Sequence, residues 1–174
     1  MTVIREYTWR EMIELTISLA GMVEAAGVRP TIVVPVLRGG SFPALVLSHV
    51  LEVRTMYAVR GSITLSDEPR ALRRVPIIEG GNSLPDLSRD HVLLVDDVTN
   101  TGDTLTAARA AIEMSANPKA LSTACVIWDT VAPNGSDRIS TCAADFYADR
   151  THAWVSFPWE RLDLTADSVR QSFE

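Results

Sequence analysis

The sequence predicts an α/β domain with a mostly parallel central sheet flanked by helices. Short β-branched runs, such as 31–36 and 91–95, are apolar on both faces, which is typical of strands buried in a parallel sheet. These runs alternate with stretches whose apolar residues recur every three or four positions, the spacing of a helix packed along one face. The chain has 174 residues, of which 47% are hydrophobic and 22% are charged. We therefore expect a single domain covering residues 1–174.

Composition and charge exclude several classes of protein. A net charge of −6, from 22 acidic and 16 basic residues, argues against a nucleic-acid partner. No apolar run approaches the roughly 20 residues that span a bilayer, and the N-terminus lacks the layout of a signal peptide. We therefore expect a cytoplasmic protein with no membrane partner. Cys125 and Cys142 are the only cysteines, and two reduced thiols are expected rather than a metal site.

The first half of the chain gives clear signals for helix and strand boundaries. Thr8 and Glu11 have the spacing of a capping box, so a helix is expected to begin there and to end before Gly27. The elements expected after it are a strand over 31–36, a polar turn over 37–40, a helix over 41–52 with Ser41 as its candidate N-cap, and a strand over 54–60.

Residues 61–90 lack a clear pattern. They contain three prolines, the pair Gly80-Gly81 and many charges. A stretch of this length without regular structure is often a mobile lid, so a flexible loop is expected here. An alternative is that part of it forms a hairpin.

The second half returns to alternating elements. We expect a strand over 91–95 that ends at Asp96-Asp97, a helix over 104–115, a strand over 120–128, and short strands near 144–147 and 154–157. Ligands of parallel sheets bind at the carboxyl ends of the strands. Three polar turns are expected at that edge, over 37–41, 96–104 and 128–137.

The stretch 96–104 carries the strongest chemical signal. Two adjacent carboxylates at the end of an apolar strand are unfavourable unless cations or hydroxyl groups pair with them. The turn after them opens a helix, and its backbone N–H groups, hydroxyls and helix dipole would bind a phosphate. Carboxylates beside a phosphate site suit a sugar phosphate. The alternative is that Asp96 and Asp97 cap the turn while Gly102 only permits a tight bend.

Three segments of the sequence resemble the type I phosphoribosyltransferases. Val92–Leu105 is similar to their motif for 5-phosphoribosyl 1-pyrophosphate (PRPP), and Val36–Ala44 is similar to their pyrophosphate loop. Trp154–Glu160 is similar to a C-terminal segment of the bacterial and archaeal xanthine-guanine and hypoxanthine branch. The resemblance implies the type I phosphoribosyltransferase fold with a small C-terminal hood over 144–174. It also implies a homodimer that uses PRPP, a nucleobase-like molecule and Mg²⁺.

The resemblance further implies a role for each matching residue. Asp96 and Asp97 would bind the ribose hydroxyls and, together with Arg38, form the catalytic group. Arg38, Gly39 and Gly40 would hold pyrophosphate, often after a non-proline cis peptide bond. The PRPP phosphate would be held by Val98, Thr99, Asn100, Thr101, Gly102, Asp103 and Thr104. The base would contact Asn100, Trp154 and Val155, and the metal would be held by Asp96, Asp97 and Glu160. Mg²⁺ fits better than zinc because these ligands are hard oxygens.

The sequence departs from the family on the side of the base. Enzymes for 6-oxopurines usually have Asp where Asn100 stands, and Asn cannot accept a proton from the purine. They also carry a Lys just past the strand that follows the PRPP helix, whereas residues 128–131 contain none. Trp154 has an alternative interpretation as a core residue, and Trp159 is expected to be core. Arg70, Arg73 and Arg74 form either a solvated charge cluster or a lid over pyrophosphate.

The leading hypothesis is a phosphoribosyltransferase that joins the phosphoribosyl group of PRPP to a purine-like base. One alternative is a regulatory protein that senses PRPP or a nucleotide on the same fold. Another is an enzyme of a specialised pathway that acts on an unusual heterocycle.

Overall fold

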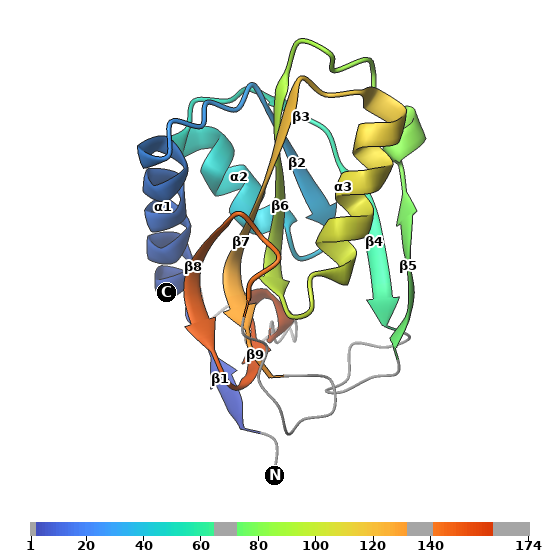
Figure 1. Ribbon diagram of the computed structural model, residues 1–174. Helices are drawn as coiled ribbons and strands as arrows, with labels where there is room; N and C mark the ends of the chain where they lie inside the picture. Colours follow the sequence, from blue (N-terminus) through green and yellow to red (C-terminus); the bar gives the residue numbers. More distant parts are fainter. Residues whose placement is uncertain (1–2, 65–72, 132–140, 162–174) are drawn as a thin grey trace, which may run out of the picture.

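A mostly parallel sheet forms the centre of the molecule, and its strands follow the order β5-β4-β2-β6-β7-β8, with β3 beside β2 (Figure 1). The computed structural model describes residues 3–64, 73–131 and 141–161. The strands of this sheet are β2 (Ile32–Leu37), β3 (Thr55–Met56), β4 (Val59–Thr64), β5 (Arg73–Glu79), β6 (His91–Thr99), β7 (Ala120–Asp129) and β8 (Phe146–Thr151). Only the β4–β5 pair is antiparallel among the described pairings. The expected fold class is confirmed.

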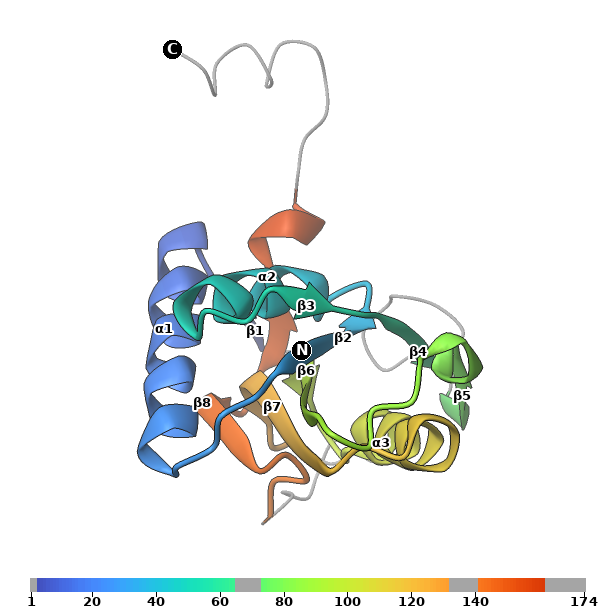
Figure 2. The ribbon, with the colours of Figure 1, turned by 90° about the horizontal axis from the view of Figure 1, so that it is seen from above.

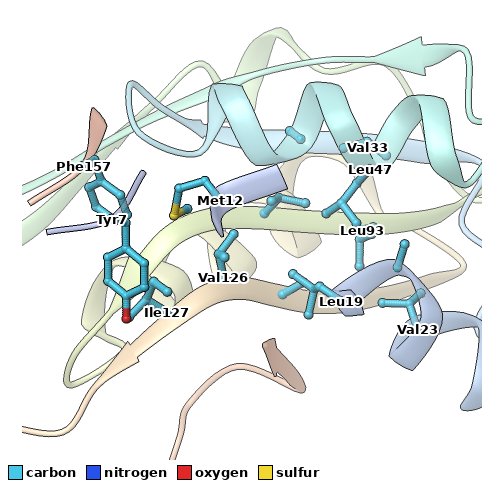
Figure 3. Packing of buried hydrophobic residues seen from close by; sticks show 14 of the residues in the cluster. Tyr7, Met12, Leu19, Val23, Val33, Leu47, Leu93, Val126, Ile127 and Phe157 are labelled. Atoms are coloured by element: carbon cyan, nitrogen blue, oxygen red, sulfur yellow. The ribbon is translucent and has the colours of Figure 1, made fainter. Parts of the chain in front are cut away.

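Helices cover both faces of the sheet, as Figure 2 shows. The helices α1 (Trp9–Ala25) and α2 (Ser41–Val50) lie on one face, and α3 (Asp103–Ala116) lies on the other. The first face carries a core cluster in which α1, α2 and the strands interdigitate (Figure 3), and its labelled members are Tyr7, Met12, Leu19, Val23, Val33, Leu47, Leu93, Val126, Ile127 and Phe157. A second cluster, around Val34, Leu94, Leu105 and Ile112, fills the space beneath α3.

The two helix N-caps predicted from sequence, Thr8 and Ser41, have different outcomes. The capping box is confirmed, since the Glu11 N–H donates to Thr8 Oγ1 at 3.2 Å and the Thr8 N–H donates to Glu11 Oε2 at 2.8 Å. The N-cap predicted at Ser41 is wrong, because α2 is capped by Gly40 without a side-chain hydrogen bond. The Gly40 N–H donates to the Val36 carbonyl at 3.0 Å, so the chain turns tightly onto β2 and is already helical at Ser41.

The strand predicted over 54–60 is divided into β3 and β4, which both pair with β2. Most of the segment 61–90 is not the loop expected for it, because β4 and β5 form a hairpin and η1 (Gly81–Ser83) follows. The hairpin alternative is therefore confirmed. Arg73 and Arg74 begin β5, whereas Arg70 and the tip at 65–72 lie outside the described residues. Closure of the tip over a ligand stays a prediction.

Strand β6 is longer than predicted, and this changes the placement of the acid pair. Its register with β7 continues to Thr99↔Trp128, so Asp96 and Asp97 lie within the strand rather than after it.

The chain near the C-terminus is divided between two sheets. β8 joins the central sheet, whereas β9 (Trp154–Ser156) pairs with β1 (Ile4–Glu6) and is followed by η2 (Pro158–Glu160). Over the described ranges, the helices are too short or too polar to cross a lipid bilayer.

Candidate ligand-binding site

The turn after β2 touches the acid pair of the neighbouring strand β6. The Leu37–Arg38 peptide bond is cis, as the resemblance implied. A Cβ atom on Gly39 would overlap the carboxylate of Asp97, so the backbone of the turn approaches that carboxylate as closely as only glycine permits. The exposed residue Arg38 precedes this contact. The structure thus brings Gly39 and Asp97 together at the carboxyl edge of two parallel strands.

Asp97 is buried and Asp96 is partly buried, so water stabilises the charges of this acid pair poorly. Asp97 is 8% exposed, and Asp96 is half-buried. The Asp97 N–H donates to Asp96 Oδ1 at 3.0 Å, and the Val98 N–H donates to Asp97 Oδ1 at 2.7 Å. Burial raises the pKa of Asp97 to about 6 against the opposing effect of the Val98 hydrogen bond. Burial and the neighbouring charge of Asp97 raise the pKa of Asp96 well above its usual range.

No basic side chain of the described residues forms an ion pair with either carboxylate. Carboxylates without an ion-pair partner are stabilised by a ligand that brings positive charge or hydroxyl donors to them. The oxygens of Asp96 and Asp97 therefore suit a hard cation or the hydroxyls of a sugar.

The turn after β6 presents the N-terminus of α3. Gly102 is the N-cap, with φ +83°, and no side chain caps this end within the part of the chain that the structure describes. A side chain at residue 102 would overlap Ala143, so this turn is packed tightly against Ala143. The Thr101 hydroxyl donates to Asp103 Oδ2 at 2.7 Å. The backbone N–H groups at the start of α3, together with the helix dipole, favour an anion at this place.

Asn100 links this turn to the end of β7. Its Nδ2 donates to the Asp129 carbonyl at 2.9 Å and to the Val131 carbonyl at 2.6 Å. The Val131 N–H in turn donates to Asp129 Oδ1 at 2.9 Å. The two amide hydrogens of Asn100 are thus directed at the protein's own backbone, and they fix residues 129–131 beside the turn at residues 100–102.

Two groups near the end of β7 were missed in the sequence. Trp128 is 4% exposed, contacts Tyr147 edge to face at 5.3 Å, and has the one buried side-chain N–H left without a partner among the described residues. His152 contacts the hydroxyl of Thr130 through its Nδ1. Both arrangements depend on the pairing of β7 with β8, so no local pattern could have predicted them.

The predicted residues near the C-terminus are distributed over the surface and the core. Trp154 is half-buried in β9, and Val155 is buried in the core. Trp159 packs against the core as expected, stacked on Phe157 with ring centroids 4.6 Å apart. Glu160 accepts the Phe157 N–H at 2.9 Å, and its negative charge contributes to the raised pKa of Asp97. In residues 3–64, 73–131 and 141–161, no three His, Cys, Asp or Glu side chains form a ready metal site.

Comparison with known families decides the classification. The model of the phosphoribosyl transferase domain matches residues 9–161. The chain belongs to the phosphoribosyltransferase family. The matched range of this phosphoribosyltransferase includes the turn after β2, the acid pair and η2. No curated protein matches the chain.

Solved structures support the same classification. The chain is 26% identical to a purine phosphoribosyltransferase from Pyrococcus horikoshii, covering 93% of this chain and 97% of that one with a TM-score of 0.68. It is 20% identical to the xanthine-guanine-hypoxanthine phosphoribosyltransferase of Helicobacter pylori, covering 98% and 99% with a TM-score of 0.71. It is also 21% identical to a hypothetical protein from Neisseria gonorrhoeae with bound ppGpp, covering 100% and 99% with a TM-score of 0.76. The last two show a shared fold.

Proposed function

We propose that the protein transfers the phosphoribosyl group of PRPP to a purine-like base, with Mg²⁺, giving a nucleoside 5′-monophosphate and pyrophosphate. Membership of the family and the similarity to a purine phosphoribosyltransferase support this reaction. The observation that carries it is the contact between Gly39 and the buried carboxylate of Asp97. Through this contact, a turn suited to pyrophosphate lies directly beside a pair of acids suited to ribose.

The proposed reaction replaces one bond at C1′ of the ribose by another. The bond to the pyrophosphate oxygen breaks, a bond to a nitrogen of the base forms, and the sugar passes through an oxocarbenium-like state. Negative charge grows on the leaving oxygens, where Arg38 and the N–H of Gly39 stabilise it. The N–H of Gly40 is not available, because it donates to the Val36 carbonyl.

Bound Mg²⁺ would supply further positive charge to the leaving pyrophosphate, as is typical of this family. Asp96, Asp97 and Glu160 would hold the ion together with oxygens of the ligand, because hard carboxylate oxygens match this cation. The two carboxylates would also accept hydrogen bonds from the ribose hydroxyls, and such charge-assisted bonds are stronger than neutral ones. Residues 98–104 would hold the 5′-phosphate at the N-terminus of α3.

The base is expected to stack on Trp154 and to contact Val155 and the turn at Asn100. The departures at residue 100 and over 128–131 indicate that hypoxanthine, guanine and xanthine are poor acceptors. Adenine and other heterocycles that need no proton removed at this position are expected to be better ones.

A second candidate function is the binding of a purine nucleotide without transfer. The shared fold of a protein that binds ppGpp, over nearly the full length of both chains, favours it. In that case the same turn and helix N-terminus would hold the nucleotide's phosphates, and catalysis would be absent.

Incubation with PRPP and Mg²⁺ across a panel of purines and other heterocycles, with pyrophosphate release as the readout, separates the two functions. The proposal predicts release that depends on both Mg²⁺ and one class of base. Binding of PRPP or ppGpp in calorimetry, with no release from any base, would favour the regulatory function instead.

A further inference from the structure

The turn between β8 and β9 carries an exposed imidazole at the carboxyl edge of the sheet. Strands β6, β7 and β8 are parallel, so their carboxyl ends lie at the same edge (Figure 1). The register pairs Asp129, at the end of β7, with Thr151, at the end of β8. His152 follows Thr151 directly and is exposed. It therefore lies one strand away from residues 129–131, which Asn100 holds.

Hydrogen bonds attach the turn that carries His152 to the end of β7. The Thr130 N–H and hydroxyl both donate to the Thr151 carbonyl, each at 3.0 Å. The Ala153 N–H donates to Thr151 Oγ1 at 3.2 Å. Thr130 Oγ1 also contacts His152 Nδ1. Thr130 is buried, so the exposed ring of His152 is anchored to a fixed part of the structure.

These contacts determine which nitrogen of His152 carries the proton. A threonine hydroxyl has one hydrogen and two lone pairs. The hydroxyl hydrogen of Thr130 is donated to the Thr151 carbonyl, so Thr130 Oγ1 accepts from His152. The neutral ring therefore has its proton on Nδ1 and an unshared electron pair on Nε2. Among the described residues Nε2 has no partner, and it is able to accept a proton.

The proposed reaction requires a group that accepts a proton. A purine loses one ring proton when it becomes the neutral base of a nucleotide. Asn100 cannot take this proton, because an amide nitrogen is not basic and its two hydrogens are donated to backbone carbonyls. Of the three histidines in the sequence, His49 lies in the last turn of α2, and His91 begins β6 and contacts Ser122. Only His152 follows the carboxyl end of a strand.

The position of His152 also suits the expected place of the base. Trp154, on which the base is expected to stack, follows His152 by two residues. The end of β8 lies two strand spacings, about 10 Å, from the end of β6, with β7 between them. A base that extends from a ribose at the acid pair towards Trp154 would therefore come close to the turn between β8 and β9.

We propose that His152 is the general base of the transfer, and that its Nε2 takes the proton that the purine loses. This role rests on the proposed function. As the C1′–N bond forms, the C1′–O bond breaks and its electron pair leaves with pyrophosphate. The N–H bond of the purine breaks, its electron pair stays in the purine ring, and the proton passes to Nε2. The imidazolium keeps its Nδ1–H bond to Thr130 and then releases the Nε2 proton to water.

Steady-state transfer from PRPP to adenine with Mg²⁺, followed by pyrophosphate release, tests this role. His152→Asn keeps an N–H group for Thr130 but has no basic nitrogen. We expect its kcat to fall about 10²–10⁴-fold, with an unchanged KM for PRPP and an unchanged melting temperature. His49→Asn, at an exposed position of α2, is the matched control and should keep full turnover.

Asp129 is a competing proton acceptor at the end of β7. Its Oδ1 accepts the Val131 N–H at 2.9 Å, and Asp129→Asn retains an oxygen for this bond while removing the charge. Full turnover of His152→Asn, or a fall in kcat for Asp129→Asn but not for His152→Asn, would overturn the proposal.

Added imidazole separates a proton acceptor from a structural contact. In His152→Ala we expect it to restore kcat by about tenfold, a small part of the loss expected for a missing general base. The parent protein and Arg38→Ala, which loses activity for another reason, should not respond. No restoration would show that the ring acts only through its contact with Thr130, and would overturn the proposal.

Nitrogen NMR of the histidine rings tests the tautomer without any substrate. The signals of His152 are identified by their loss in His152→Asn, at a pH where the ring is neutral. We expect the proton on Nδ1. A proton on Nε2 would overturn the proposal whether or not the protein transfers the phosphoribosyl group.

These outcomes distinguish the role of His152 from the proposed function. An active parent protein with an equally active His152→Asn variant would overturn the role of His152 alone. A parent protein that binds PRPP but releases no pyrophosphate with any purine would overturn the proposed function, and the role of His152 with it, even if the proton lies on Nδ1.

Discussion

Strand β6 is apolar along its first half and acidic along its second. Val92 to Val95 are fully buried and divided between the two core clusters. Asp96 and Asp97 follow directly and are partly and fully buried, without a basic partner among the described residues. Both have raised pKa values because of burial. The first half stabilises the fold, whereas the second half costs stability. This difference is expected if the polar end of the strand is retained for a ligand, as proposed above.

The largest expected effect on stability is in the apolar half. Leu93→Ala removes a fully buried side chain from the cluster shown in Figure 3 and is expected to lower the free energy of unfolding by about 2–5 kcal/mol. Denaturant unfolding measures it, with Met114→Ala as the control because Met114 is 88% exposed. A loss below 1 kcal/mol for Leu93→Ala, on the order of a surface change, would contradict this division of the strand.

Arg38→Ala tests the proposed ligand site beside the acidic half of β6 and leaves the core unchanged. Arg38 is exposed, and its proposed role is to stabilise the leaving pyrophosphate. Turnover is expected to fall about 10²–10³-fold, the effect of removing one charge-stabilising donor, while the melting temperature stays nearly unchanged. Arg10→Ala, at an exposed position on α1, is the matched control. A large loss of stability with full activity would show that Arg38 is structural.

Gly39→Ala tests the contact between the turn and the acid pair. The added carbon would overlap the Asp97 carboxylate, so the turn or the carboxylate must move, at a cost of about 1–3 kcal/mol. We expect weaker PRPP binding in calorimetry. Gly21→Ala is the control, because a Cβ there meets nothing within 4 Å. Equal PRPP affinity for the two variants would contradict the proposed site.

Asn100→Asp tests the assignment of the base. It would place a carboxylate against the carbonyls of Asp129 and Val131, which now accept from Asn100 Nδ2. We expect residues 129–131 to shift and activity with every acceptor to fall, at a cost of about 1–3 kcal/mol. Steady-state assays with adenine and the 6-oxopurines measure this. Selective gain of guanine or hypoxanthine turnover would show that residue 100 acts on the base directly.

Much of the fold was predictable because its signals are local. The runs that form β2 and β7, and the capping box at Thr8 and Glu11, are visible in short windows of sequence. The β4–β5 hairpin was only an alternative, because its pairing depends on contacts distant in sequence rather than on periodicity. The position of the acid pair inside β6 was missed for a related reason, since only the pairing with β7 shows that the strand continues to Thr99.

The candidate site was predictable as a set of turns but not as a set of contacts. The sequence predicted a site around Arg38, Asp97 and Gly102, because their motifs are contiguous. The approach of Gly39 to Asp97 and the use of the Asn100 amide by residues 129–131 depend on how neighbouring strands end. Contacts between the ends of neighbouring strands cannot be predicted from a local sequence pattern.

Asp97→Asn compared with the parent protein, in unfolding experiments from pH 4 to pH 8, tests most directly whether the acidic half of β6 is kept for a ligand. The folded pKa of Asp97 is raised to about 6, so its ionised form is penalised only in the folded state. The penalty is absent below about pH 4, grows as the pH rises to about 6, and is constant above. Without ligand, the variant should therefore become more stable than the parent by about 1–3 kcal/mol at neutral pH. With PRPP and Mg²⁺ the order should reverse, because only the parent gains the charge-assisted bonds to the sugar. A stability difference that does not change with pH, together with equal stabilisation of both proteins by PRPP, would contradict the account.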